Sequence, residues 1–139
     1  MSEKNMELLG ALLGKAMNEN DTSTVDALVA PSYVNHDAPV PVRGPEGFKQ
    51  LVGMFRAAFP DLRVVVEDTF TDGDLVGSRG TINGTHGGDF MGVPATGRPV
   101  SIKYIDLWRV EDGRFTETWV QMDSLGLMQQ IGALPAPAA

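Results

Sequence analysis

The hydrophobic pattern of this sequence changes its period once, near Leu62, and this change limits the possible fold more than any single motif does. Before Leu62, apolar side chains recur at helical spacing in three stretches: 6–17, 25–29 and 48–59. After Leu62, β-branched runs and turn signals predict four strands and one closing helix: 62–67, 75–86, 99–110, 114–122 and 125–131. Helices first and strands second, without alternating strand–helix units, predict an α+β fold with an antiparallel sheet.

Proline and polar residues mark the ends of the predicted helices. Asp21 or Thr22 can cap the second helix, and we expect Pro31 to stop it because proline cannot continue a helix. The segment 32–36 then reads as a short extended stretch. Pro45 suits the first position of the third helix, which we expect to end before Pro60.

The predicted sheet is long and strongly curved, so we expect it to wrap over the N-terminal helices and enclose one apolar pocket. The glycine-rich stretch 87–97, with Pro94 inside it, is predicted as a loop near the mouth of that pocket. Earlier in the chain, Pro39 and Pro41 predict another loop. A length of 139 residues suits one domain. We predict that this domain spans residues 1–134 and that 135–139 form a loose C-terminal tail.

The composition argues against several classes of partner. The net charge is −7 and the isoelectric point is about 4.6, which disfavours nucleic acid and anionic membranes, because both require a concentrated basic surface. No apolar run approaches the roughly 20 residues of a membrane helix. The chain has no cysteine, which excludes disulfides and zinc–thiolate sites, and the N-terminus does not have the pattern of a secretory signal. We therefore expect a cytoplasmic protein.

Strand alternation sorts the polar residues of the last two strands. One face of 99–110 carries Asp106 among apolar side chains: Val100, Ile102, Tyr104, Trp108 and Val110. Alternation along the next strand places together Phe115, Glu117, Trp119, Gln121 and Asp123. These patterns predict that one face of the sheet presents Tyr104, Trp119 and Gln121 together with Asp106 and Asp123.

A carboxylate among aromatic side chains is a candidate general acid or base, because desolvation destabilises its charged form. Asp106 and Asp123 meet this description. The structural alternatives are that Asp123 caps the final helix and that Asp106 pairs with a nearby arginine. Arg79, in the middle of a strand, is a natural partner for either aspartate, and it can equally form an ion pair with no function.

The two histidines, His36 and His86, lie in polar sequence contexts where an imidazole can reach a ligand or a carboxylate, or have a structural role. Neither belongs to a pattern with metal-ligand spacing, so we predict no metal site.

Several short motifs occur together, in order, along nearly the whole chain: Tyr33-Val34-Asn35-His36, Gly44-Pro45-Glu46-Gly47, Phe59-Pro60-Asp61-Leu62, Gly84-Thr85-His86 and Gly92-Val93-Pro94-Ala95-Thr96-Gly97-Arg98. The pattern continues to the end of the predicted domain: Asp106, Arg109, Asp112-Gly113-Arg114, Glu117, Trp119, Asp123 and Gln130-Ile131-Gly132. In this ordered set the chain resembles the SnoaL-like polyketide cyclases, or ester cyclases, of the NTF2-like superfamily. The resemblance implies the cone-shaped fold of NTF2, scytalone dehydratase and ketosteroid isomerase.

The resemblance also implies an activity. Characterised members of the family close a ring of an aromatic polyketide ester by intramolecular aldol condensation, without metal or cofactor, using an aspartate in the pocket as acid and base. It further implies a homodimer and a hydrophobic, oxygenated small-molecule substrate. Carried over to this chain, it favours Asp123 as the acid/base, with Asp106 as its rival and His36 and His86 as polar partners. The residues expected to contact the substrate are Tyr33, Asn35, Arg79, Phe90, Met91, Tyr104, Trp119 and Gln121.

One departure from the family leaves alternatives open. The cyclases can carry a histidine on the penultimate strand where this chain has Tyr104 or Asp106. Epoxide hydrolysis by two aspartates bridged by Arg79, and isomerisation of a ketone by one aspartate, use the same fold. A non-enzymatic alternative is a small-molecule carrier or an assembly module.

Overall fold

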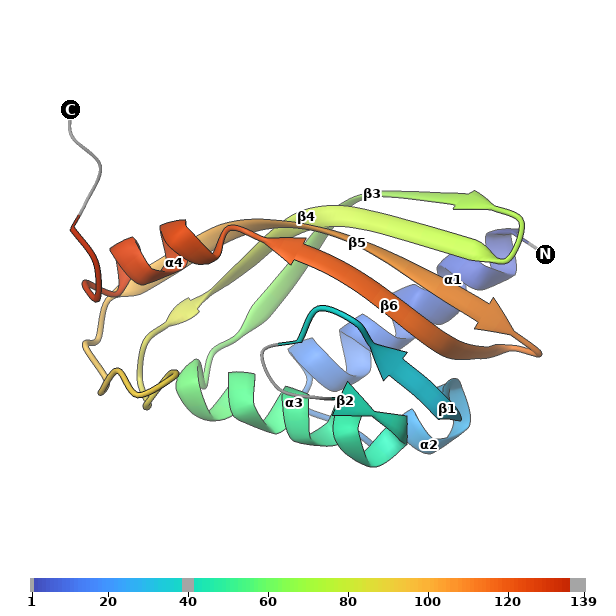
Figure 1. Ribbon diagram of the computed structural model, residues 1–139, viewed down its shortest axis with the longest axis horizontal. Helices are drawn as coiled ribbons and strands as arrows, with labels where there is room; N and C mark the ends of the chain where they lie inside the picture. The colour runs from blue at the N-terminus through green and yellow to red at the C-terminus, as the bar shows by residue number, and fades with distance from the viewer. Residues whose placement is uncertain (1, 39–41, 136–139) are drawn as a thin grey trace.

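The computed structural model describes residues 2–38 and 42–135 (Figure 1). The helices are α1 (Ser2–Leu12), continued by a π-helical turn η1 (Leu13–Asn18), then α2 (Val25–Leu28), α3 (Gly44–Ala58) and α4 (Ser124–Gln130). The strands are β1 (Val29–Asn35), β2 (Val42–Arg43), β3 (Arg63–Asp72), β4 (Leu75–Thr85), β5 (Pro99–Glu111) and β6 (Arg114–Met122). The predicted change from helices to strands near Leu62 is confirmed. The extended stretch predicted at 32–36 lies in β1 up to Asn35, and β2 is an additional strand.

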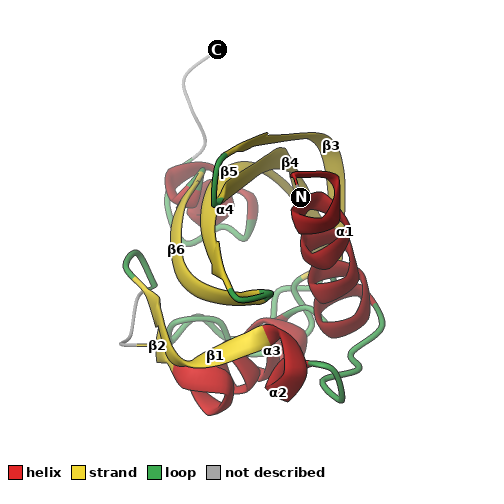
Figure 2. Cartoon of the chain, turned by 90° about the vertical axis from the view of Figure 1, so that its right-hand side faces the viewer, coloured by secondary structure: helices red, strands yellow, loops and turns green. Residues whose placement is uncertain are grey.

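The strands form a six-stranded sheet in the order β2-β1-β6-β5-β4-β3. The sheet curls strongly, and α1 and α3 lie along its open side (Figure 2). The predicted α+β fold with a curved sheet and N-terminal helices is confirmed. One pair differs from the antiparallel prediction, because β1 runs parallel to β6. No helix within the described ranges is long and apolar enough to cross a membrane.

The second helix is shorter than predicted. It ends at Leu28, and Pro31 lies inside β1 rather than at a helix end. The register of β1 against β6 shifts in this part of the strand, between Val29 and Val34, so Pro31 occupies an irregular stretch of the sheet where a missing N–H is tolerated. The N-cap residue is Thr24, without a side-chain hydrogen bond, and not Asp21 or Thr22.

The turn η1 widens the end of the first helix and ties it to the sheet. The Asn18 side chain donates to the Val64 carbonyl oxygen and accepts from the Val64 N–H, so it pairs with β3 as a neighbouring strand would. Leu13 and Met17 from the same turn face the interior, where they line the cavity described below. A π-helical turn therefore both fixes β3 and shapes the pocket.

The predicted alternation on β5 is confirmed: Val100, Ile102, Tyr104, Asp106, Trp108 and Val110 are all buried. The alternation predicted on β6 is wrong beyond its first residues. Val110 pairs with Phe115 and Arg109 pairs with Glu117, so Thr116 is an extra residue in a β-bulge. The bulge turns Thr118, Val120 and Met122 inward, opposite Trp108, Asp106 and Tyr104.

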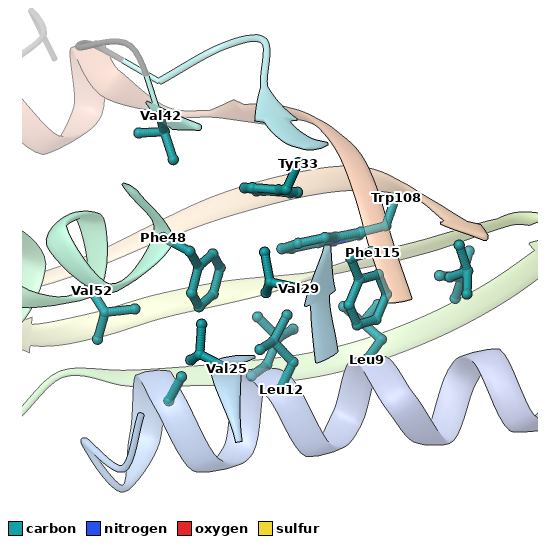
Figure 3. Close-up of a cluster of buried hydrophobic side chains, with 14 residues drawn as sticks. Leu9, Leu12, Val25, Val29, Tyr33, Val42, Phe48, Val52, Trp108 and Phe115 are labelled. Carbon is teal, nitrogen blue, oxygen red and sulfur yellow. The ribbon is translucent and has the colours of Figure 1, made fainter. Parts of the chain in front are cut away.

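The interior consists of two apolar clusters. In one cluster, α1, α3 and β1 pack around Trp108 and Phe115, as Figure 3 shows. The other lies between the end of α3 and α4 and includes Phe55, Phe59 and Phe90. The predicted loop at 87–97 is present between β4 and β5. Pro39 and Pro41 lie outside the described residues, as does the predicted tail apart from Pro135.

Candidate active site

Two adjoining hollows lie inside the curved sheet. The inner chamber has a volume of about 90 Å³ and is lined almost wholly by apolar atoms, and the outer chamber, which lies beside it, has about 450 Å³. The two share five lining residues: Asn35, Leu51, Phe55, Val120 and Met122. The predicted apolar pocket is therefore present, as a narrow apolar chamber beside a wider one.

Asp106 lies at the inner chamber with only 5% of its surface exposed. Ser78, directly opposite on β4, holds it: the Ser78 N–H and hydroxyl both donate to Asp106 Oδ1, at 3.1 and 2.6 Å. Both bonds end on the same oxygen, which leaves Oδ2 free of Ser78. The carboxyl group is thus fixed in orientation through one of its two oxygens.

Burial raises the pKa of Asp106 above its ordinary value, and the hydrogen bonds from Ser78 oppose part of that rise. A carboxyl group in this state takes up and releases a proton more readily near neutral pH than an exposed aspartate does. Among the described residues that line the inner chamber, Asp106 is the one carboxylic acid, and none is a lysine, arginine or histidine.

Two groups of hydroxyls lie at the inner chamber with Asp106, and one of them is hydrogen-bonded to it. Because Ser78 donates its proton to Asp106, the Tyr104 hydroxyl, 3.2 Å from Ser78 Oγ, donates to Ser78. The Tyr33 hydroxyl is 2.8 Å from Thr118 Oγ1. Burial raises the pKa of both tyrosines, so both hydroxyls keep their protons at neutral pH.

The outer chamber contains the predicted residues Asn35, Phe90, Met91 and Gln121. Asn35 joins the two chambers, and its Oδ1 accepts from the Asp37 N–H, so its amide N–H₂ is turned the other way. The loop between β4 and β5 supplies Phe90, which is buried, and Met91, which is 62% exposed. Met122 and Met128 complete a flexible apolar wall that can adapt to a ligand.

His36 and Trp119 lie on the face of the sheet turned away from the chambers, which we call the outer face. Trp119 pairs with Leu107 there because the bulge at Thr116 reverses the alternation of β6. The His36 ring stacks on Trp119, with ring centroids 5.1 Å apart, and its Nε2 is 2.9 Å from Glu117 Oε2. The structure therefore does not bring these two residues together with Asp106.

His86 is fully buried beneath the loop that follows β4, outside both chamber linings. Its Nδ1 accepts from the Thr96 N–H at 3.3 Å and is 2.9 Å from Thr96 Oγ1, and its ring packs against Phe59. The backbone of His86 also pairs with Gly97 and Arg98. These contacts close the base of the loop.

The predicted partnership of Arg79 with Asp106 or Asp123 is wrong. Arg79 pairs across the sheet with Ile105, on the outer face, whereas its neighbour Ser78 faces inward to Asp106. The guanidinium group of Arg79 instead forms ion pairs with Glu67 and Asp68 on β3.

Asp123 follows β6 and is exposed. It is the N-cap of α4, where its Oδ1 accepts from the Gly126 N–H at 2.8 Å. It is not among the residues that line either chamber, and the predicted shared face with Asp106 is wrong because β6 ends before it. Asp123 therefore caps the final helix, as the structural alternative for this residue predicts.

Sequence reasoning missed Ser78, Thr118 and Trp108 as parts of the site. The register of β4 against β5 in the structure, which places Ser78 opposite Asp106, identifies the first of these. Within the described ranges, no three histidine, aspartate or glutamate side chains lie together as a metal site requires.

A curved α+β cone with a buried, oriented aspartate in an apolar chamber is typical of enzymes that act on small molecules. The chain belongs to the SnoaL-like polyketide cyclase family, whose sequence model matches residues 8–131. This confirms the resemblance noted in the sequence, and the chain is an enzyme of the polyketide and ester cyclase kind.

Individual relatives agree with this assignment. Nogalonic acid methyl ester cyclase of Streptomyces nogalater is 31% identical over 123 residues, which are 84% of this chain and 90% of that one. Aklanonic acid methyl ester cyclase DauD of Streptomyces sp. (strain C5) is 31% identical over 85% of this chain and 76% of its own. The structure of TsrD from Streptomyces laurentii matches with a TM-score of 0.87 and 34% identity, covering 95% of this chain and 97% of TsrD.

Proposed function

We propose that this enzyme closes a ring in a hydrophobic, polyketide-like ester by a cofactor-free intramolecular aldol reaction, with Asp106 as acid and base. The observation that carries the proposal is the position of Asp106: a buried carboxyl group, oriented by Ser78 and facing an apolar chamber. Its raised pKa supports both uptake and return of a proton.

In the proposed reaction, the Asp106 carboxylate takes a proton from a methylene carbon beside a carbonyl group. The electron pair of the broken C–H bond forms a C=C bond, and the carbonyl electrons move to oxygen as an enolate. The enolate carbon then attacks a second carbonyl group of the same molecule, forming the ring C–C bond and an alkoxide. The alkoxide takes the proton back from Asp106, so no co-reactant is consumed.

The chambers support an uncharged substrate. The inner chamber offers one carboxyl group, that of Asp106, and no cationic side chain. A substrate with a free carboxylate would therefore place its negative charge beside Asp106 with no positive charge to balance it. An ester avoids this cost, in agreement with the methyl esters that two relatives are named for. The outer chamber, with Phe90, Met91 and Met128, is suited to the ring system, and the Asn35 amide is suited to a substrate oxygen where the chambers meet.

Asp123 and the histidines have less support in these roles, because none of them lines a chamber. Epoxide hydrolysis by paired aspartates loses its support as well, because Arg79 binds Glu67 and Asp68 on the outer face. We therefore choose Asp106, the rival in the sequence-based assignment, over Asp123.

The test is the substitution Asp106→Asn, which keeps the shape of the side chain and its acceptor for Ser78. We expect kcat for cyclisation of a cognate methyl ester to fall by about a thousandfold, the usual contribution of a general acid/base. Asp123→Asn is the matched control, and we expect it to retain most of the activity. If kcat fell more in Asp123→Asn than in Asp106→Asn, Asp123 would be the general acid/base. A loss of affinity without a change in kcat would make Asp106 a substrate-binding residue and not the acid/base, and a wild type that binds the ester without turnover would indicate a carrier.

We further propose that residues 1–134 act as one domain, that the enzyme works in the cytoplasm, and that it forms a homodimer. The absence of cysteine supports a reducing compartment. Exposed apolar side chains on the outer face, Phe70 and Ile105, support the homodimer.

A further inference from the structure

Trp108, which lines the inner chamber, carries a buried hydrogen-bond donor without an acceptor, its indole Nε1. In the described part of the chain, four buried side-chain polar atoms are without a partner, and Trp108 Nε1 is the one whose residue lines a chamber. An indole N–H can only donate, and leaving it buried and unpaired has a free-energy cost. Such a cost is explained if the acceptor arrives with the ligand.

The Trp108 ring is held in place on several sides, so the direction of its N–H is fixed before a ligand binds. Tyr33 lies over the ring, as Figure 3 shows. The two ring centroids are 6.2 Å apart, with an interplanar angle of 18°. Phe48 and Phe115 contact it edge-on at 6.4 and 5.1 Å. With 4% of its surface exposed, the residue has little room to turn. A donor fixed in this way stabilises a developing negative charge without first reorganising.

Trp108 and Asp106 converge on the same small volume. They lie two residues apart on the inward face of β5, which separates their Cα atoms by about 6.6 Å. The indole N–H lies near enough to the Asp106 carboxyl group to lower its pKa as a weak hydrogen-bond donor, but the contact falls short of full hydrogen-bond geometry, so the N–H can still donate to a ligand oxygen. The hydroxyl groups of Tyr33 and Tyr104 already have partners, Thr118 and Ser78.

Building on the proposed role of Asp106, we propose that the Trp108 indole N–H binds the substrate carbonyl oxygen beside the carbon that Asp106 deprotonates. When the C–H bond breaks and its electron pair moves through the carbonyl group, the negative charge develops on that oxygen. The hydrogen bond then strengthens, so it lowers the barrier more than it tightens binding of the ground state. The group that enters the inner chamber is accordingly a neutral ketone or ester carbonyl with an adjacent acidic methylene.

Trp108→Phe removes the donor and keeps an aromatic ring. We expect kcat to fall by about a hundredfold, as when an oxyanion donor is removed, with KM changed by less than about tenfold. Phe115→Leu is the control for packing, because it loosens the contact with Trp108 and leaves the N–H present. We expect this variant to melt earlier and to keep a near-normal kcat. A kcat for Trp108→Phe within twofold of the wild type, or an equal loss in Phe115→Leu, would overturn the proposal.

A second measurement separates this proposal from the proposed function. Methyl anthraquinone-2-carboxylate is neutral, offers carbonyl oxygens and has no acidic methylene, so it can bind but not cyclise. In wild-type protein labelled with ¹⁵N-tryptophan, we expect this probe to move the Trp108 indole proton downfield and to leave that of Trp119, on the outer face, in place. A Trp108 proton that stays in place up to the solubility limit of the probe contradicts the proposal. If the Trp108 proton moves downfield but the protein cyclises no ester, the hydrogen bond from Trp108 to a carbonyl oxygen is supported and the proposed reaction is rejected.

Discussion

At the scale of single residues, the buried carboxyl group of Asp106 links folding to pH. Burial raises its pKa in the folded protein above the ordinary value of 3.8. Between those two pKa values the folded chain binds more protons than the unfolded chain does, so this group's contribution to stability falls as the pH rises through that window. This sign is opposite to that of most aspartates.

Asp106→Asn removes this titration, and the prediction concerns the difference between the two proteins. We expect the free energy of unfolding of the wild type, minus that of the variant, to decrease as the pH rises from below 3.8 towards neutrality. Urea unfolding at a series of pH values measures it. Other acidic groups with shifted pKa, such as Asp61 and Glu117, titrate in both proteins and cancel. A difference that does not vary with pH would show that Asp106 is not desolvated in solution.

At the scale of elements, the loop after β4 is attached to the end of α3 by two glycines. The N–H groups of Gly87 and Gly88 both donate to the Ala58 carbonyl oxygen, at 3.0 and 3.1 Å. A Cβ atom on Gly88 would collide with the carbonyl oxygen of Ala57. The loop is held this closely because glycine has no side chain.

Gly88→Ala should therefore push the loop away from α3 and, with it, Phe90 and Met91 of the outer chamber. We expect a loss of about 1–3 kcal/mol in the free energy of unfolding, the usual cost of overpacking, and a higher KM. Gly53→Ala is the matched control, because Gly53 is exposed on α3 with open space around its Cα. It should stabilise the helix by up to about 1 kcal/mol. Denaturant unfolding compares the two, and an equal response would show that the loop is not anchored at Gly88.

The strands β5 and β6 differ in how well the sequence predicts which side chains face inward. On β5 the alternation runs without interruption, so it correctly places Asp106 among buried aromatic residues. On β6 a bulge at Thr116 reverses the alternation, and no turn residue or glycine announces it in the sequence. One extra residue therefore moved Trp119 from the predicted pocket to the outer face and hid the inward role of Thr118.

Contacts between distant segments were also beyond the sequence pattern. The parallel pairing of β1 with β6 depends on residues about 80 positions apart, for which local periodicity carries no information. The orientation of Asp106 by Ser78 depends on the register of β4 against β5, and the long loop between these strands does not fix that register in the sequence. The ordered family motifs did predict the fold and the class of enzyme, because they span nearly the whole chain.

At the scale of the whole molecule, the outer face of the sheet should form the homodimer. Phe70 and Ile105 are 53% and 59% exposed on this face, beside the half-buried Leu107 and Trp119. A group of apolar side chains exposed together is typical of an interface between protein chains. In a two-fold dimer each substitution on this face occurs twice, so one charge should be enough to separate the chains.

Ile105→Glu tests this arrangement with little risk to the fold, because the side chain is exposed and Arg79 lies opposite it. We expect the wild type to sediment at twice the chain mass of 14.9 kDa and the variant at the mass of one chain. Leu125→Lys is the control: Leu125 is equally exposed, at 62%, but lies on α4, so this variant should remain a dimer. A wild type that sediments as a single chain at every concentration would leave the outer face exposed for a different purpose.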